Sequence, residues 1–381
     1  MTSSSSLLYV LLIMGFTWVV TVVAIALIPY YTRKSIAFGV AVPPEQNKGE
    51  FLSSLRKHYA WSSTILGIVL ALVSLPAILR LEENAAALIS TGALLLYIVL
   101  TFVIFARCNV IVRDHKRNSD WILRSIATAE LVHRNDQRKL FSPLWYLTHL
   151  ALIALVAILG IWRYPDLPAQ LPTQYDLGGH VTTMIEKSYW AILQMPLMMF
   201  LMTLLFAAIG FGINRAKRQT DDNDLARGLR NNRSFQIIMG QSMFWLALLM
   251  QAILAAAQLS MIGLLGLQIS LWLTLILLLI ISVGVVLITI RVGQGGYRLS
   301  TGAKSSDSTD DSLVTDDDTY WKFFGSLYNN PDDPSIFVEK RVGFGWTVNV
   351  GQPIGMALLT GTLALLVVLL IALPFLYQAS Q

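Results

Sequence analysis

Long apolar runs without a single charged side chain constrain this fold more than any other feature. Eight runs of this kind contain no Asp, Glu, Lys or Arg: 7–29, 60–79, 85–106, 144–162, 189–212, 236–263, 268–290 and 354–377. Each has about the 20 residues that a helix needs to cross the hydrocarbon layer. Only 13% of the chain is charged, against roughly 25% in soluble domains. We therefore predict an all-α membrane protein, an eight-helix transmembrane bundle.

Basic residues are distributed very unevenly between the connecting segments. Of the 28 Lys and Arg residues, all but Arg80, Arg163 and Lys187 lie in alternate segments, those that follow the first, third, fifth and seventh runs. By the positive-inside rule these four segments are cytoplasmic, so we expect both termini outside and a multipass protein of the cell membrane. The outside turns 80–84 and 264–267 are short, and we expect the runs that flank each turn to pack as antiparallel hairpins.

The chain divides into four parts by composition. Residues 1–298 form the predicted bundle of the first seven spans, and residues 353–381 form the last span with an outside tail. Between them, 299–318 ("LSTGAKSSDSTDDSLVTDDD") has hardly any apolar side chain and is predicted to be a disordered linker. The aspartates lack the loop glycine and terminal Glu of a calcium-binding EF-hand. Residues 319–352 are predicted to be a small cytoplasmic module.

The module is rich in aromatic residues and turn signals. "IFVEKR" and "WTVNV" are typical of short strands, and we predict one cluster of Trp321, Tyr328, Phe337 and Trp346 beside the headgroups. Asp332 and Asp333 are expected to hold the turn Asn329–Asp333, which precedes "IFVEKR", through backbone amides. Two interpretations stay open, an aromatic belt without further function and a binding surface. The candidate residues are Trp321, Tyr328, Asp332, Asp333, Lys340, Trp346 and Asn349.

Recognisable catalytic and metal-binding patterns are missing from the sequence. The five histidines show no zinc spacing, and there is neither a nucleophile-elbow nor a phosphate-loop motif. We therefore expect no catalytic residue, no cofactor, no metal site and no direct contact with nucleic acid. Cys108 is the only cysteine, which excludes an intrachain disulfide.

Three polar side chains lie inside the apolar runs and are candidates for a structural or functional role. His149 is the one ionisable side chain at membrane depth, a position where such residues are costly and often functional. Gln251 and Gln258 lie in another run and are possible hydrogen-bond partners for it. A structural interhelical bond is the favoured interpretation, and the lining of a polar cavity is the alternative.

A stretch between the fourth and fifth runs, "LPAQLPTQYDLGGHVTTMIEKS", resembles the proline-rich extracytoplasmic segment of a bacterial membrane family of unknown function. That family includes the SdpI-like immunity proteins, which protect a cell from its own secreted toxin. Gln174 stands where the family usually has a histidine, and His180 follows six residues later. The matching residues are Leu167, Pro168, Leu171, Pro172, Tyr175, Gly178 and Lys187. "IAFGVAVPPE" is similar to the family's first cytoplasmic loop, and the module is similar to a small domain of unknown function.

The prolines of this stretch are expected to stiffen the chain, and the glycines are expected to let the chain reverse its direction. The outside loop 163–188 would then form an ordered cap, either a contact surface for something external or a structural lid. The resemblance implies a non-enzymatic protein that gives immunity to, or senses, an envelope-active peptide or toxin. Its partners would be the lipid bilayer, that extracellular peptide and a cytoplasmic regulator. The alternative is a transporter or lipid-handling protein with a polar cavity lined by His149, Gln251 or Gln258.

Overall fold

The computed structural model of the chain describes residues 3–80, 83–119, 121, 141–175, 181–216, 225–296, 298–299, 318–343, 345–364 and 368. Within these residues six helices are long and apolar enough to cross a membrane, and they coincide with the second to seventh predicted spans. The shorter apolar helices Met14–Ala26 and Pro353–Ala364 fall in the first and last predicted spans. A multipass membrane protein is therefore supported, and the count of eight spans stays a prediction.

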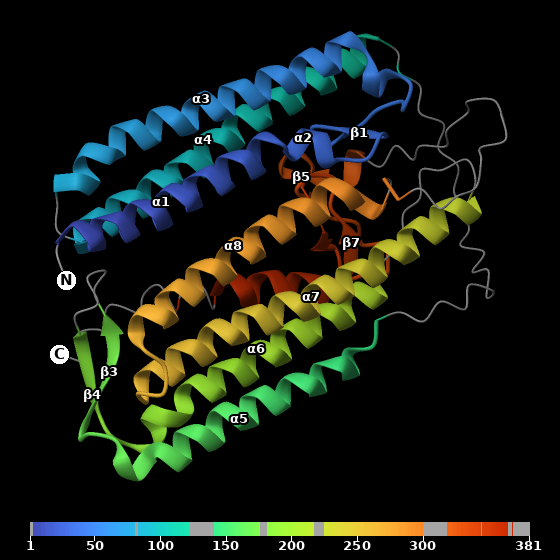
Figure 1. Cartoon of the computed structure of the whole chain (residues 1–381). Helices are drawn as coiled ribbons and strands as arrows, with labels where there is room; N and C mark the ends of the chain where they lie inside the picture. Colours follow the sequence, from blue (N-terminus) through green and yellow to red (C-terminus); the bar gives the residue numbers. More distant parts are fainter. Residues whose placement is uncertain are drawn as a thin grey trace.

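The helices form two groups that follow the order of the chain (Figure 1). In one group α3 packs against α4 and α1 packs against both, and in the other α5, α6, α7 and α8 pack side by side. The expected antiparallel pairs α3–α4 and α7–α8 are in contact, and residues 262–266 connect the second pair. The bounds are α1 (Ser3–Ala26), α2 (Ile28–Tyr31), α3 (Glu50–Arg80), α4 (Glu83–Asn118), α5 (Leu147–Arg163), α6 (Tyr189–Arg215), α7 (Leu225–Met261) and α8 (Leu267–Val292).

Helices dominate because a membrane leaves no water to satisfy backbone amides, which a helix satisfies internally. Local sequence sets several of their ends. Ser188 precedes α6, and its Oγ accepts a hydrogen bond from the Ala191 amide at 3.1 Å. Gly293 ends α8 with a φ of 67°, a conformation that glycine adopts readily.

Among the described residues, eight short strands lie outside the helices and pair as four antiparallel hairpins. β3 and β4 lie at one end of the molecule, and the strands of the module lie at the other (Figure 1). The bounds are β1 (Ile36–Ala37), β2 (Val40–Ala41), β3 (Gln170–Tyr175), β4 (Val181–Glu186), β5 (Trp321–Lys322), β6 (Leu327–Tyr328), β7 (Phe337–Glu339) and β8 (Trp346–Val348). The two predicted strand segments of the module are thus confirmed as β7 and β8.

The two ends give a direct test of the predicted orientation. In a Cys108→Ser background, which removes the only cysteine, a cysteine is placed at Thr182 of β4 or at Asp332 of the module, both exposed positions. Because the basic segments are predicted to be cytoplasmic, a membrane-impermeant maleimide should label Thr182→Cys in intact cells. Asp332→Cys should react only after permeabilisation, and its labelling in intact cells would reverse the orientation.

Candidate functional site

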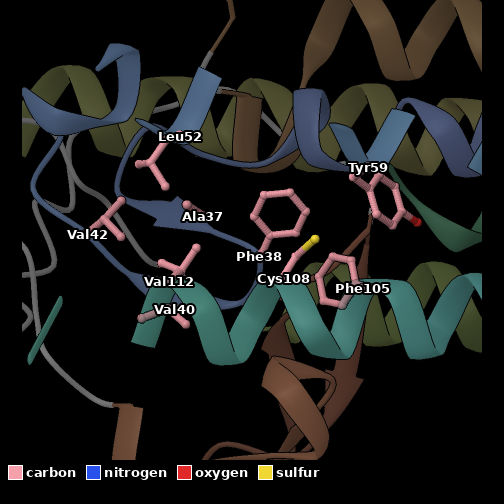
Figure 2. Close-up of a cluster of buried hydrophobic side chains, with 9 residues drawn as sticks. All are labelled: Ala37, Phe38, Val40, Val42, Leu52, Tyr59, Phe105, Cys108 and Val112. Atoms are coloured by element: carbon pink, nitrogen blue, oxygen red, sulfur yellow. The ribbon is translucent and has the colours of Figure 1, made fainter. Parts of the chain in front are cut away.

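The densest buried core of the described chain lies where the loop after α2 enters between α3 and α4. Phe38 is 1% exposed and packs edge-on against Tyr59, with ring centroids 5.8 Å apart. Its carbonyl accepts a hydrogen bond from Asn109 Nδ2 of α4 at 2.6 Å. The side chains that gather around it are drawn in Figure 2 and are Ala37, Val40, Val42, Leu52, Tyr59, Phe105, Cys108 and Val112. The loop is therefore a structural part of the first helix group.

Phe38 and Gly39 form the two-residue turn of the β1–β2 hairpin. Both have a positive φ, 48° and 80°, as a type I′ turn requires. Glycine is needed at the second position for another reason, because a Cβ there would overlap the backbone carbonyl of Phe324 in the module. Gly325 of the module is also close to this turn, since a Cβ added to it would lie 2.7 Å from Cα of Gly39. The module therefore packs on this turn backbone against backbone.

Asp318 joins the module to the first helix group through charge. Its carboxylate accepts hydrogen bonds from the Ala41 amide at 3.0 Å, from Lys116 Nζ of α4 at 2.7 Å, and from Arg341 Nη1. Burial alone would raise the pKa of the Asp318 carboxyl, but the charge of Arg341 and the bonds from Lys116 and Arg341 outweigh burial and hold this pKa below its ordinary value. Composition places Asp318 at the end of the linker; the structure places it in the module.

A second buried ion pair joins the module to the segment after α2. Arg33 and Glu339 of β7 form a salt bridge, and their side chains are 6% and 1% exposed. Arg33 Nε also donates to Glu339 Oε1 at 3.2 Å. Gly295, just after α8, packs directly on this pair, since a Cβ there would lie 3.1 Å from Arg33 Nε. Desolvated charges of this kind require a fixed geometry.

Aromatic side chains of the module contact the second helix group. The Phe337 ring lies 3.4 Å from the Cβ position of Gly212 in α6, and the Trp346 ring lies 5.2 Å from that of Phe235 in α7. Inside the module, Trp321, Tyr328 and Val338 form the buried cluster. The predicted single cluster of four aromatic residues is therefore wrong. Alternation along β7 turns Val338 inward and Phe337 outward, so Phe337 and Trp346 dock the module on the helices.

Asn349 holds the turn between β6 and β7. Its side chain is fully buried; its Nδ2 donates to the carbonyls of Asn330 and Asp333, and its Oδ1 accepts from the Asn330 amide at 3.0 Å. Asp333 accepts from the Ser335 amide at 3.0 Å, as expected for a turn aspartate, and from the Tyr328 hydroxyl at 3.1 Å. Asp332 is exposed, and its amide donates to Asn330 Oδ1. The half-buried Lys340 pairs through its amide with the Gly345 carbonyl.

The proline-rich stretch forms the β3–β4 hairpin at the opposite end. Pro172 lies in β3 opposite Met184, with an irregularity in the register just after it. Leu171 is fully buried in a cluster with Ile192 of α6 and Ile262 after α7. Gln174 belongs to β3, but its side chain lies outside the described part, as do Gly178 and His180. Pro168 lies two residues before β3.

Lys187 fastens the base of this hairpin. Its amide donates to the Ala169 carbonyl at 2.8 Å, and its Nζ donates to the carbonyls of Leu167 at 2.9 Å and Pro165 at 3.3 Å. The same ammonium lies over the Tyr164 ring, 4.9 Å from its centroid. The hairpin is thereby fixed to the ends of α5 and α6.

The interior glutamines bind the backbone of a neighbouring helix. Gln251 Nε2 donates to Thr203 Oγ1 at 2.5 Å and to the Met199 carbonyl at 3.3 Å, and Gln258 Nε2 donates to the Ile192 carbonyl at 3.0 Å. All of these partners lie in α6. His149 is fully buried and stacks on Phe244, with ring centroids 4.7 Å apart. Neither of its ring nitrogens has a hydrogen-bond partner among the described residues, so the expected bond to the glutamines is not present there.

Comparison with known families identifies two segments of the chain. Residues 151–200 match a domain of unknown function (DUF1648), and residues 331–356 match a family of unknown function (DUF5808). The first segment covers most of α5, the β3–β4 hairpin and the start of α6, and the second covers the end of the module. No curated protein and no solved structure matches the chain. The two segments that match are those that carry the hairpin and the docking surface of the module.

The module is held in place by residues that the sequence analysis did not single out. Arg33, Lys116, Asp318, Glu339 and Arg341 make its buried charge contacts. The segment "IAFGVA" does carry a local signal for the turn, because Phe-Gly stands between two short β-forming pairs. Lys116 and Asp318 lie 202 positions apart and Arg33 and Glu339 lie 306 apart, separations that no local pattern reveals.

Substituting Asp318 tests the charge contact. Asp318→Asn should destabilise module docking by about 1.5–3 kcal/mol, the range for a buried charge-assisted hydrogen bond. In the native chain, a carboxylate whose pKa is lowered on folding stabilises the docked state above its unfolded pKa of about 4. That stability should be lost as the pH falls below this value toward the lower folded pKa.

Hydrogen exchange of the β5–β8 amides in nanodiscs measures this docking. Exchange should be faster in Asp318→Asn than in the native chain at neutral pH, and the difference should shrink as the pH falls below about 4. Asp332→Asn, at an exposed position of the same module, should leave exchange unchanged. Equal protection of these amides in Asp318→Asn and in the native chain would show that the charge contact does not stabilise docking of the module.

A pair of glycines tests the backbone packing. Gly39→Ala and Gly343→Ala each place a side chain at a positive φ, 80° and 78°, which costs about 1 kcal/mol in either case. Only Gly39→Ala also drives a methyl group into the Phe324 carbonyl; nothing among the described residues lies within 4 Å of the Gly343 position. The thermal midpoint should therefore fall much further for Gly39→Ala. Equal losses would show that the turns are not in contact.

Proposed function

We propose that this chain is a non-enzymatic multipass protein of a bacterial cell membrane that senses, or gives immunity to, an envelope-active peptide. The β3–β4 hairpin is the outer receiving element, and the module is the cytoplasmic element that contacts a regulator or partner protein. The observation that carries the proposal is the pair of fixed structures at opposite ends of one helix group.

The hairpin has the properties of a receiving surface. Its inner side is held by Leu171 and Lys187, while Met184 and Val181 of β4 are 53% and 39% exposed. A surface that is already ordered loses little conformational entropy on binding. An extended or amphipathic peptide at the membrane surface would meet this strand first.

The helices beneath the hairpin link it physically to the module. α6 begins under the hairpin, is bonded to α7 along its length by Gln258, Gln251 and Gln236, and ends beside Phe337 of the module. A displacement at the hairpin end therefore has a continuous packed path to the module. This arrangement suits sensing, in which two sites are coupled through a common element.

Transport receives less support from the interior contacts. The Nε2 groups of Gln251 and Gln258, which a polar cavity would need, donate to backbone carbonyls of α6, although their Oε1 atoms have no hydrogen-bond partner among the described residues. Their use between helices is structural, and such bonds are worth about 0.6–2 kcal/mol. Transport therefore stays the second hypothesis.

Survival of a deletion strain tests the proposal. Loss of the gene should raise sensitivity to at least one peptide in a panel of membrane-active peptides, and the native chain should restore resistance. Met184→Asp should fail to restore it at equal membrane abundance. Leu264→Asp, which changes another exposed apolar residue (42% exposed) at the same end, should restore it. Unchanged survival of the deletion strain across the panel would refute the peptide function.

A further inference from the structure

Two consecutive phenylalanines of the module have a backbone conformation that side chains rarely adopt. Phe323 and Phe324 have φ values of 47° and 59°, and Gly325 follows with 86°. Bulky residues with positive φ are uncommon and cost of order 1–3 kcal/mol each, so they persist only where surrounding contacts fix them. Here the contact of Gly325 with Gly39 fixes the turn.

This turn brings Phe324 against the membrane-spanning part of α4. The Phe324 ring lies edge-on to that of Phe102, with centroids 5.9 Å apart. Phe102 lies inside an apolar run, five residues before Arg107, the first basic residue of the following segment. At 1.5 Å per residue the contact is about 7 Å below that arginine along the helix axis. The tip of the module therefore reaches the edge of the apolar layer.

The surface beside this contact faces lipid. Phe102, Val99 and Ile98 are 43%, 59% and 47% exposed, and they belong to a helix that is long and apolar enough to cross the membrane. Further along α4, Phe105, Cys108 and Val112 are covered by the loop after α2, while Val110 and Ile111 on another face stay 47% and 45% exposed. The module tip thus lies beside the exposed apolar surface of α4, next to the face that the loop after α2 covers.

The part of the chain that the structure describes leaves Phe323 largely exposed. Its side chain is 69% exposed, although it stands next to Phe324 at the edge of the apolar layer. The adjoining residue, Lys322, is exposed, and its Nζ donates to the Thr319 carbonyl at 3.0 Å. An exposed aromatic ring beside an ammonium is typical of side chains that enter the interface between acyl chains and headgroups.

We propose that Phe323 is a lipid anchor, inserted between phospholipid acyl chains beside α4, and that Lys322 faces the headgroup phosphates. The occupant is the bilayer because Phe323 adjoins Phe324, whose ring contacts Phe102 on the exposed apolar surface of α4. The turn at 323–325 would then serve to direct an apolar side chain into the bilayer from a module that otherwise lies outside it. This inference is independent of what the hairpin binds.

A fluorescent label tests the anchor in the full-length chain. In the Cys108→Ser background, Phe323→Cys carries an NBD group, and the protein is reconstituted in phosphatidylcholine–phosphatidylglycerol nanodiscs. The emission should be blue-shifted, resistant to aqueous iodide, and reduced several-fold by lipids with a doxyl group on the acyl chain. The same label at Asp332→Cys, an exposed module residue, should be quenched by iodide and not by doxyl lipid.

Two outcomes of the measurement at position 323 would overturn the proposal. Iodide quenching at 323 equal to that at 332 would place Phe323 in water. Protection from iodide without quenching by doxyl lipid would mean that a protein surface, from a partner or a second copy, covers the ring.

A second label site keeps Phe323 intact. Lys322→Cys with the same NBD group should be quenched by a doxyl group placed at the headgroup more strongly than by one deep in the acyl chain. If this label responds to neither lipid, the anchor proposal fails regardless of how the Phe323 variant folds.

Discussion

The packing of one left-handed turn on another sets the geometry of the module end. Gly39 and Gly325 meet backbone to backbone, with no side chain between them that could adjust. Backbone contacts of this kind allow essentially one relative position, and buried charges need such a position to recover their desolvation cost. Arg33 with Glu339, and Asp318 with Lys116 and Arg341, can therefore be paired away from water. The charge pairs depend on the turn contact for their alignment.

The two helix groups are connected in different ways to the two ends of the molecule. The hairpin contacts only the second group in its buried cluster, through α6 and the end of α7. The module contacts both groups, through Gly39 and Lys116 on one side and Gly212 and Phe235 on the other. Arg298 adds a direct link, because its Nη1 and Nη2 donate to the carbonyls of Ile290 and Tyr30. The module end is thus where the position of one group relative to the other is determined.

Much of the membrane architecture could be predicted from the sequence, because lipid imposes a simple rule on composition and length. Six spans and two helical hairpins follow from charge-free runs and short turns, and the strands β7 and β8 follow from local residue preference. The aromatic cluster could not be predicted, because alternation in β7 decides that Phe337 faces the helices and Val338 faces the interior. By composition Asp318 belongs to a polar linker. Its position is fixed by hydrogen bonds from Ala41, Lys116 and Arg341, which are distant in the sequence or, for Arg341, lie in the connection between β7 and β8. The ring nitrogens of His149, which have no hydrogen-bond partner among the described residues, likewise depend on which helix faces α5.

The chain order of these contacts has a consequence for biosynthesis. Arg33 and Glu339 are 306 positions apart, and Arg341 and Gly39 are 302 apart. The segment after α2 leaves the ribosome early, yet its partners emerge only after seven of the eight apolar runs. At about 5–20 residues per second, the early segment waits on the order of half a minute before its charges can be paired. During that interval the β1–β2 hairpin has α3 and α4 to pack against but no cover over Gly39. A nascent chain therefore carries an open docking surface until Glu339 and Arg341 have emerged, and this assembly step joins segments that are 306 and 302 positions apart.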